Sequence, residues 1–206
     1  MFMDRPQNSD PGYAREDWQK HYDTDDLKWD LGQPAPPFVR LWDDKTLVPG
    51  CAIVPGCGRG HEIVFLAEKG FQVTGVDFAQ GAVDALTRSL REKGLEARVL
   101  HQDFFQLDER HDTAYDLMLE QTFFCAIHPS QRPRYVATAA RILKTGGLLA
   151  ALFYETGEEG GPPFNSAEAD IRRHFSEKFA IEHLQKTPHS IERRKDKEWL
   201  GLLRRK

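Results

Sequence analysis

A short apolar stretch that runs directly into three closely spaced glycines constrains this chain more than any other feature. Residues 51–55 read CAIVP, and glycines follow at positions 56, 58 and 60. Glycine tolerates positive φ, and a ligand can approach its backbone closely because it has no Cβ. An apolar strand, a glycine loop and a helix from His61 are typical of the ligand-binding turn of a parallel α/β sheet.

Strand-like and helix-like segments alternate through the rest of the chain. The pattern predicts strands at 71–77, 96–103, 115–121 and 148–154, and helices at 61–70, 79–93, 129–143 and 166–177. Alternation with nearly continuous apolar strands indicates a parallel sheet that helices cover on both faces, a doubly wound α/β fold. The last two strands, 179–186 and 197–205, have no helix between them, so we expect them to pair antiparallel at one edge.

The length of the chain and the positions of its prolines constrain the domain organisation. A chain of 206 residues is enough for about one domain. We therefore expect a single domain over 13–206, with a distinct N-terminal segment at 13–45. Residues 1–12 are polar and contain two prolines, so we expect them to be frayed or disordered. The stretch QPAPP at 33–37 predicts a break in any helix.

Charge and cysteine content narrow the class of protein. A net charge of −4 gives no electrostatic case for nucleic-acid binding. No segment approaches the roughly 18 apolar residues of a membrane helix, and the N-terminus lacks a signal-peptide layout, so we expect a cytoplasmic monomer with no membrane partner. The three cysteines argue against a disulfide framework, and no metal-ligand spacing is present. We expect Cys57 and Cys125 to be structural, and the basic C-terminal cluster to be a solvated surface.

The residues around the glycine loop discriminate between three kinds of cofactor. A phosphate loop needs Lys and then Ser or Thr after its last glycine, but His61 and Glu62 follow Gly60. A dinucleotide fingerprint needs a wider glycine spacing, and Glu62 would repel a pyrophosphate at the positive end of the helix. S-adenosylmethionine has no phosphate and fits an acidic, aromatic site. It is therefore the favoured cofactor, and a nicotinamide cofactor is the weaker alternative.

Acidic residues stand at the ends of three successive predicted strands. Asp77 follows the loop by about 20 residues and suits the two ribose hydroxyls of S-adenosylmethionine. Asp103, which Phe104 follows, offers an acceptor for the adenine amine beside an aromatic wall. Glu120 would lie near the sulfonium. Carboxyl ends of parallel strands meet at one edge, so we expect one shared crevice, although each acid alone could simply cap the next helix.

Six motifs spread over the chain carry a family resemblance. They are the aromatic pattern WxxxYxxxxxxWDxG at 18–32, VPGCGRGHE at 54–62, GVD at 75–77, FFCAIHP at 123–129, GGPPF at 160–164 and PHSIERRKDKEWLG at 188–201. In these motifs, roughly from Tyr13 to Arg205, the chain resembles the thiol, halide and thiopurine S-methyltransferase-like family. The resemblance is greatest to its thiol/halide branch.

The resemblance implies a seven-stranded, Rossmann-like methyltransferase sheet with an N-terminal aromatic lid in 13–45. It also implies S-adenosylmethionine as cofactor, S-adenosylhomocysteine as product and no metal. The cofactor-binding positions that it implies, together with the acidic residues above, are Trp18, Tyr22, Trp29, Gly56, Gly58, Asp77, Phe78, Asp103, Phe104 and Glu120. Aromatic rings can hold a sulfonium by cation–π attraction worth about 2 kcal/mol when desolvated.

Methyl transfer asks the protein mainly for positioning, because a sulfonium methyl group is already activated. We expect Glu120, Gln121 and Tyr154 to be the catalytic residues on the acceptor side. The thiol/halide branch often has Asp-Tyr where this chain has Glu120-Gln121, and Trp in place of Tyr22. An amide at position 121 puts halide methylation in doubt and leaves the identity of the acceptor open; we expect a small thiol or sulfide. Thiopurines, selenium or tellurium species, and cofactor binding without turnover are the alternatives.

Overall fold

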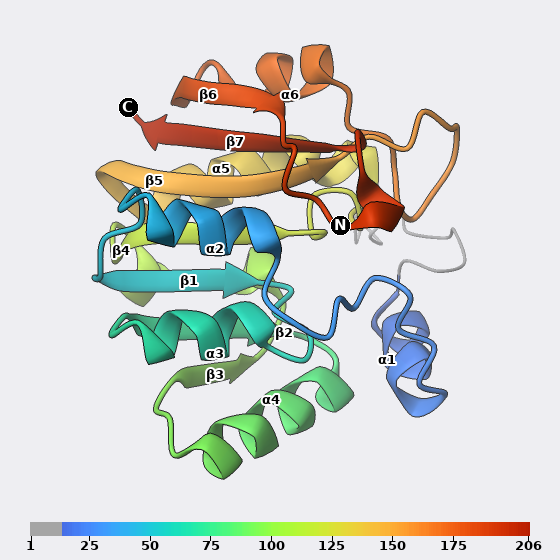
Figure 1. The fold of residues 1–206 in the computed structure, drawn as a ribbon, viewed down its shortest axis with the longest axis vertical. Coiled ribbons are helices and arrows are strands. Elements are labelled where there is room, and N and C mark those ends of the chain that lie inside the picture. Colours follow the sequence, from blue (N-terminus) through green and yellow to red (C-terminus); the bar gives the residue numbers. More distant parts are fainter. Residues whose placement is uncertain (1–13) are drawn as a thin grey trace, which may run out of the picture.

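Seven strands form one mixed sheet at the centre of the molecule (Figure 1). The computed structural model describes residues 14–206, so the expectation that 1–12 are frayed lies outside the described residues. The strands are β1 (Cys51–Pro55), β2 (Gln72–Asp77), β3 (Arg98–His101), β4 (Tyr115–Gln121), β5 (Leu143–Tyr154), β6 (Phe179–Lys186) and β7 (Glu198–Arg205). Their order across the sheet is β3-β2-β1-β4-β5-β7-β6.

The pairing of the strands confirms the predicted parallel sheet with an antiparallel final pair. β1 pairs in parallel with β2 and β4, β2 with β3, and β4 with β5. β7 lies between β5 and β6 and is antiparallel to both. β5 begins at Leu143 rather than at residue 148, because a register shift between Tyr115 and Leu117 of β4 lets the strand continue through the expected turn.

Helices flank the sheet in two groups. They are α1 (Arg15–Asp23), α2 (Pro36–Asp43), α3 (His61–Glu68), α4 (Gln80–Lys93), α5 (Arg132–Ile142) and α6 (Glu168–Phe175), with short 3-10 helices η1 (Phe104–Gln106), η2 (Glu109–His111), η3 (Pro129–Gln131) and η4 (Glu192–Arg194). Sequence reasoning missed α2. Its two prolines, interpreted as a break, occupy the first turn of the helix, where a missing N–H costs nothing.

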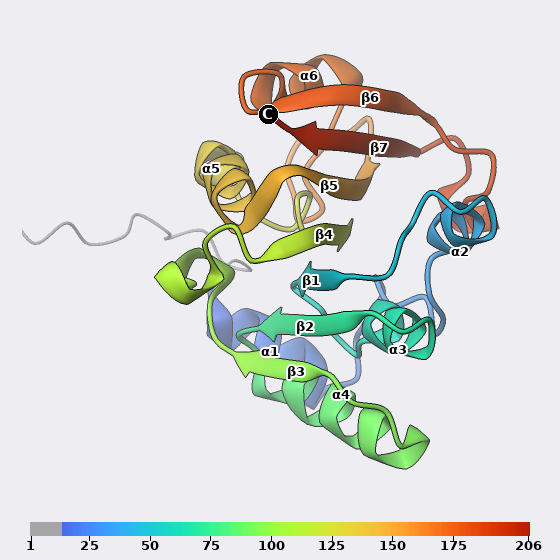
Figure 2. The same cartoon turned by 90° about the vertical axis from the view of Figure 1, so that its left-hand side faces the viewer.

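The two faces of the sheet carry separate hydrophobic cores. α2 and α3 lie on one side of the sheet and α5 on the other (Figure 2). Within β1, Ala52 and Val54 pack with the cluster that includes α2, α3 and α4, whereas Ile53 packs with the cluster of α5 and α6. Successive side chains of a strand point to opposite faces, so a strand buried on both sides reads as an unbroken apolar run. This is why the run at 51–55 predicted β1 correctly.

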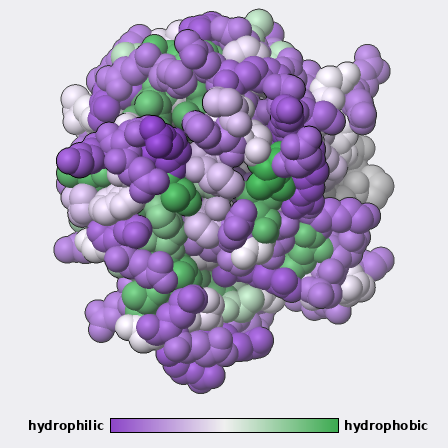
Figure 3. Space-filling view, in the orientation of Figure 1, coloured by the Kyte–Doolittle hydropathy of each residue, from purple (hydrophilic) through white to green (hydrophobic). Residues whose placement is uncertain are grey.

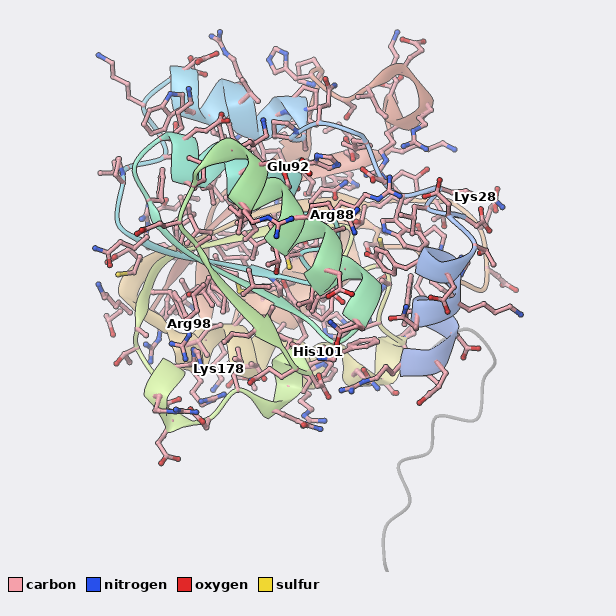
Figure 4. The ribbon with its side chains drawn as sticks, turned by 90° about the horizontal axis from the view of Figure 1, so that it is seen from below. Lys28, Arg88, Glu92, Arg98, His101 and Lys178 are labelled. Atoms are coloured by element: carbon pink, nitrogen blue, oxygen red, sulfur yellow. The ribbon has the colours of Figure 1, made fainter. Side chains whose placement is uncertain are left out.

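The carboxyl ends of the parallel strands share one edge, and the N-terminal segment lies beside it. Figure 4 shows Lys28 next to α1, on the opposite side of the molecule from Arg98 at the start of β3. The face seen in Figure 3 is mainly hydrophilic, with small separate hydrophobic areas. No helix within residues 14–206 is both long and apolar enough to span a bilayer.

Truncation of the core at β7 is expected to destabilise the protein strongly. Leu203 is fully buried, and Leu203→Ala should lower the free energy of unfolding by about 2–5 kcal/mol, since it leaves a cavity in the sheet core. Val48 is 70% exposed, so Val48→Ala should change the free energy of unfolding by less than about 0.5 kcal/mol. Urea unfolding measures both, and equal effects would contradict the core described above.

Candidate active site

A cavity of about 780 Å³ opens at the carboxyl ends of the parallel strands. Its volume is within the usual range for sites that bind small molecules and cofactors. The aromatic segment, residues 14–32, forms one wall, and the β4–α5 loop, the end of β5 and η4 form another. Nine of the residues predicted from the sequence line it: Trp18, Tyr22, Trp29, Gly56, Asp77, Phe78, Asp103, Phe104 and Tyr154.

Three predicted residues lie outside the lining of this large cavity. Gly58 and Gln121 border a smaller space of about 40 Å³ between the glycine loop and the aromatic segment. The Gln121 Oε1 atom accepts a hydrogen bond from the Thr122 hydroxyl at 3.1 Å, and its Nε2 atom is buried without a partner in the described part of the chain. Glu120 borders neither space.

The glycine loop has a conformation and an environment that favour glycine. Gly56 and Gly58 both have φ of +54°, and a Cβ on Gly56 would lie 2.4 Å from the Phe123 ring. Gly60, with φ of +80°, starts α3, and a Cβ there would lie 2.3 Å from Leu86. Side chains at Gly56 and Gly60 would therefore displace their neighbours, so the loop requires glycine at both positions.

Asp77 joins the end of β2 to this loop. Its Oδ2 atom accepts the Gly58 N–H at 2.9 Å, and its Oδ1 atom accepts the Ala79 N–H at 2.9 Å. Burial raises the pKa of Asp77, and these two N–H groups oppose that rise. A carboxylate has about four lone-pair sites, so two remain for donors on a ligand in the cavity.

Asp103 and the residues after it form a second wall. The Asp103 carboxylate accepts the Phe105 N–H at 2.8 Å and so starts η1. The Phe104 ring is buried and meets the Phe123 ring edge-on, with centroids 5.5 Å apart. Arg134 covers the Phe105 ring at 4.8 Å and donates to the Phe105 carbonyl at 3.1 Å. The result is an aromatic surface with a carboxylate at its border.

The aromatic segment docks on α4 and clusters its rings around Trp29. The Trp18 and Trp29 ring centroids are 5.3 Å apart, and those of Tyr22 and Trp29 are 6.2 Å apart. The Gln19 side chain accepts the Gly81 N–H at 3.1 Å, and a Cβ on Gly81 would lie 2.5 Å from Tyr22. Burial, with Asp77 and Cys57 nearby, raises the pKa of Tyr22, so its phenol stays neutral.

Asp30 and Glu62 tie the end of this segment to α3. The Asp30 carboxylate is 2.8 Å from His61 Nε2 and accepts the Gly32 N–H at 2.8 Å. Burial alone would raise the pKa of Asp30, but His61, Gly32 and Arg59 together hold it below its usual value. The Asp30 hydrogen bond raises the pKa of His61. Glu62 is buried and accepts the N–H of residue 35 at 3.0 Å.

Glu120 supports the loop that follows β4. Its Oε1 atom accepts the N–H groups of Phe123 and Phe124 at 2.7 and 2.9 Å. Within the described residues, its Oε2 atom and the Tyr135 hydroxyl are buried without partners. Burial raises the pKa of Glu120 to about 7 and, with Glu120 nearby, that of Cys125 to about 12. The Cys125 thiol therefore stays protonated at neutral pH, consistent with the structural role expected for it.

Sequence reasoning missed the contribution of η4. The basic cluster there was expected to be a solvated surface, but the Arg194 side chain is only 7% exposed, pairs with Glu198 at 3.1 Å and lines the large cavity. The Arg194 guanidinium also lies 5.6 Å from the centre of the Tyr154 ring. Arg194 and Glu198 carry opposite charges and lie four residues apart in the sequence. This pairing was the available signal, because a buried charge needs a partner of opposite charge.

Known methyltransferases resemble the chain along most of its length. The sequence model of the family described as Thiopurine S-methyltransferase (TPMT) matches residues 13–202. Thiocyanate methyltransferase 1 of Brassica oleracea is 34% identical over 190 residues, which cover 89% of this chain and 82% of that protein. Probable thiol methyltransferase 2 of Arabidopsis thaliana is 33% identical over 159 residues, which cover 76% of this chain and 70% of that protein.

A solved methyltransferase structure has the same architecture. The 1,6-didemethyltoxoflavin-N1-methyltransferase of Burkholderia thailandensis, solved with 1,6-didemethyltoxoflavin and S-adenosylhomocysteine, matches with a TM-score of 0.75. The match covers 98% of this chain and 93% of that one at 20% identity. The expected seven-stranded methyltransferase sheet is therefore confirmed.

Glu120 is expected to make the stability of the fold depend on pH. Its pKa rises from 4.5 to about 7 on folding. The folded state therefore binds the Glu120 proton more tightly than the unfolded state does. The resulting contribution to the free energy of unfolding is fully present below pH 4.5 and is lost as pH rises through about 7. Glu120→Gln keeps an oxygen that can accept the Phe123 and Phe124 N–H groups but cannot ionise. Between pH 5 and pH 8, the free energy of unfolding of wild type should therefore fall relative to that of Glu120→Gln by up to about 3 kcal/mol.

Urea unfolding of both proteins at the two pH values measures this difference. An identical pH dependence in wild type and Glu120→Gln would contradict the burial of an ionisable Glu120.

Proposed function

The chain belongs to the thiopurine S-methyltransferase family, and from that membership we propose that it methylates a small soft nucleophile, a thiol or sulfide in the first place. It is a methyltransferase, and S-adenosylmethionine is its methyl donor. The observation that carries the proposal is the convergence of Asp77, Asp103 and the aromatic segment on one cavity beside the glycine loop.

The residues around the cavity fit this donor. Gly56 and Gly58 carry no side chain of their own, and their backbone borders the spaces beside the loop, which suits an amino-acid head group. Asp77 has lone pairs left for two ribose hydroxyls, and Asp103 with Phe104 can bind an adenine edge and face. The rings of Trp18, Tyr22 and Trp29 form an electron-rich wall for a sulfonium. We propose as the cofactor site the nine predicted positions that border the two spaces, Phe78 included, with Glu120 acting only through the loop that it supports.

The aromatic segment is proposed to act as a lid over this site. When bound, the cofactor supplies a methyl group that its positive sulfur has already activated. The task of the chain is to hold the acceptor in place and to exclude water. Trp18, Tyr22 and Trp29 line the cavity from a segment attached to α4 through Gly81, which is the arrangement that a water-excluding cover requires.

The acceptor is proposed to bind at the opposite wall. If Asp77 and Asp103 hold the sugar and base, the remaining wall is formed by the β4–α5 loop, Tyr154 and η4. Cys125 there is protonated, and Arg194 is neutralised by Glu198. An incoming thiolate therefore meets no fixed negative charge on this wall. A soft thiolate needs no strong general base, so Tyr154 is proposed to position the acceptor rather than to deprotonate it. Glu120 is proposed to act indirectly through the loop after β4, and Gln121 from the smaller space beside the glycine loop.

The names of the relatives keep the acceptor open within one chemical class. Thiocyanate, thiols and thiopurines are all soft nucleophiles, and the relatives are named for them. Thiopurines, halides and selenium or tellurium species are therefore the alternatives to a thiol or sulfide. We also infer a cytoplasmic monomer without nucleic-acid partners, which the sparse free cysteines and the net charge of −4 support.

Asp77→Asn is expected to weaken cofactor binding. The variant loses one charged acceptor facing the cavity, and we expect the Kd of S-adenosylhomocysteine to rise about tenfold to hundredfold. Asp84→Asn is the matched control, because Asp84 is exposed on α4 and accepts only from the nearby Gln80 side chain in the described structure. Isothermal titration calorimetry compares the two, and equal affinities would contradict the placement of the ribose.

An acceptor panel tests the proposed substrate class. Sulfide, small thiols, iodide, thiocyanate, thiopurines and selenium or tellurium species are supplied with S-adenosylmethionine, and methylated products are detected by mass spectrometry. Thiols or sulfide should react fastest. Gln121→Tyr places the residue common in the thiol/halide branch and should raise the ratio of iodide to thiol product. Absence of any methylated product from the wild-type protein would reject the proposed function.

A further inference from the structure

Two neighbouring arginines hold three successive carbonyls of the aromatic segment. Arg193 Nη1 donates to the Lys28 carbonyl at 2.5 Å, and its Nη2 donates to the Asp30 carbonyl at 2.8 Å. Arg194 Nη2 donates to the Trp29 carbonyl between them at 2.8 Å. We call these three contacts the arginine clamp. They join parts of the chain that are more than 160 residues apart in sequence.

The clamp binds the aromatic segment at Trp29, the residue around which its aromatic rings cluster. Trp29 contacts the rings of Trp18, His21 and Tyr22, and all four line the large cavity. Lys28, beside it, reaches outward next to α1 (Figure 4) and its side chain is 86% exposed. The arginines therefore bind main-chain atoms, and they hold the backbone in place whichever side chains residues 28–30 carry.

The anchor of the clamp is rigid. Arg194 pairs with Glu198 of β7, whose other carboxylate oxygen accepts the Ser190 hydroxyl at 2.7 Å. Glu198 lies opposite Tyr154 in the register of β5 and β7. The segment is thus attached on one side to the sheet, and on the other side to α3 through Asp30 and His61.

We propose that Arg193 is a positioning residue that latches the aromatic segment over the cavity and so controls the escape of the cofactor. The inference rests on the proposed function, in which this segment is a lid. Arg193 does not line the cavity, so its effect on the ligand must pass through the backbone of residues 28–30. A planar guanidinium can serve two carbonyls at once, which a lysine ammonium on its flexible stem does less well.

Loss of the latch should act on dissociation more than on association. A bound ligand covered by the segment leaves only when the segment opens, so weaker fastening raises koff. Entry also requires an open segment, but the segment is closed more fully when it packs on a ligand, so kon should rise less than koff. The apparent affinity falls with the fraction of molecules in which the segment is closed. Because Arg193 is exposed and water competes for its hydrogen bonds, we expect an effect of about tenfold.

Arg193→Gln is the decisive variant, with Arg193→Lys as the conservative one. Arg194 is unsuitable, because its removal would leave Glu198 buried without its counter-charge. Arg204→Gln is the matched control. Arg204 also donates to a carboxylate, that of Glu182, and to a carbonyl, that of Gly146 at 3.1 Å. It lies opposite Leu148, six residues before Tyr154 along β5, and it does not line the large cavity.

Stopped-flow tryptophan fluorescence with S-adenosylhomocysteine measures the two rates. Arg193→Gln should raise koff about tenfold and raise kon by a smaller factor, Arg193→Lys should fall between Arg193→Gln and wild type, and Arg204→Gln should match wild type. In steady state, the KM for S-adenosylmethionine should rise while kcat stays within about twofold. An unchanged koff in Arg193→Gln, or a loss of kcat at unchanged KM, would overturn the latch.

Hydrogen exchange in the ligand-free proteins separates this inference from the proposed function. Amides of residues 26–32 should exchange faster in Arg193→Gln than in wild type and Arg204→Gln, while amides of β4 and β5 stay protected. Unchanged exchange at 26–32 would overturn the latch even if wild type binds S-adenosylhomocysteine tightly. Faster exchange in a protein that binds no S-adenosylhomocysteine would support the clamp and reject the proposed function.

Discussion

The hydrogen bond between the Asp77 carboxylate and the Gly58 N–H is the contact on which the cavity depends. It connects the end of β2 with the turn after β1, and it turns the glycine loop and the carboxylate toward the same space. A second bond, from the Ala79 N–H, fixes the carboxylate at the start of α4. The Asp77 carboxylate, which would bind the ligand, therefore also fixes the conformation of the glycine loop beside it.

The cavity is completed by parts of the chain that are far from this contact in sequence. The aromatic segment reaches α4 through Gln19 and Gly81, and α3 through Asp30 and His61. η4 meets the same segment through Arg193 and Arg194, which donate to the carbonyls of residues 28–30. Glu120 stabilises the loop after β4 by accepting hydrogen bonds from two of its backbone N–H groups. The long-range contacts to α4, α3 and η4 bring the N-terminal segment onto a strand edge that parallel α/β sheets commonly use for ligands.

Local patterns in the sequence predicted the sheet and much of the candidate site. The strands β1, β4 and β6 were predicted with their observed bounds. β1 and β4 are largely buried and therefore have a nearly continuous apolar signal, whereas β6 is an edge strand in which only Phe179 and Leu184 are buried. Asp77 and Asp103 were found because strand ends converge on one edge. α2 was missed because proline both breaks and begins helices. The burial of Arg194 was missed because its partners, Trp29 and Tyr154, come close only in the folded chain.

A crystal structure of the protein grown with S-adenosylhomocysteine tests the central claim most directly, because it shows which groups meet the sugar and the base. The account predicts that both ribose hydroxyls donate to Asp77, that the adenine lies against Phe104 with its amine at Asp103, and that Trp29 covers the amino-acid part. Electron density for the ligand elsewhere in the molecule, or a ligand in the cavity with Asp77 and Asp103 turned away from it, would contradict the account.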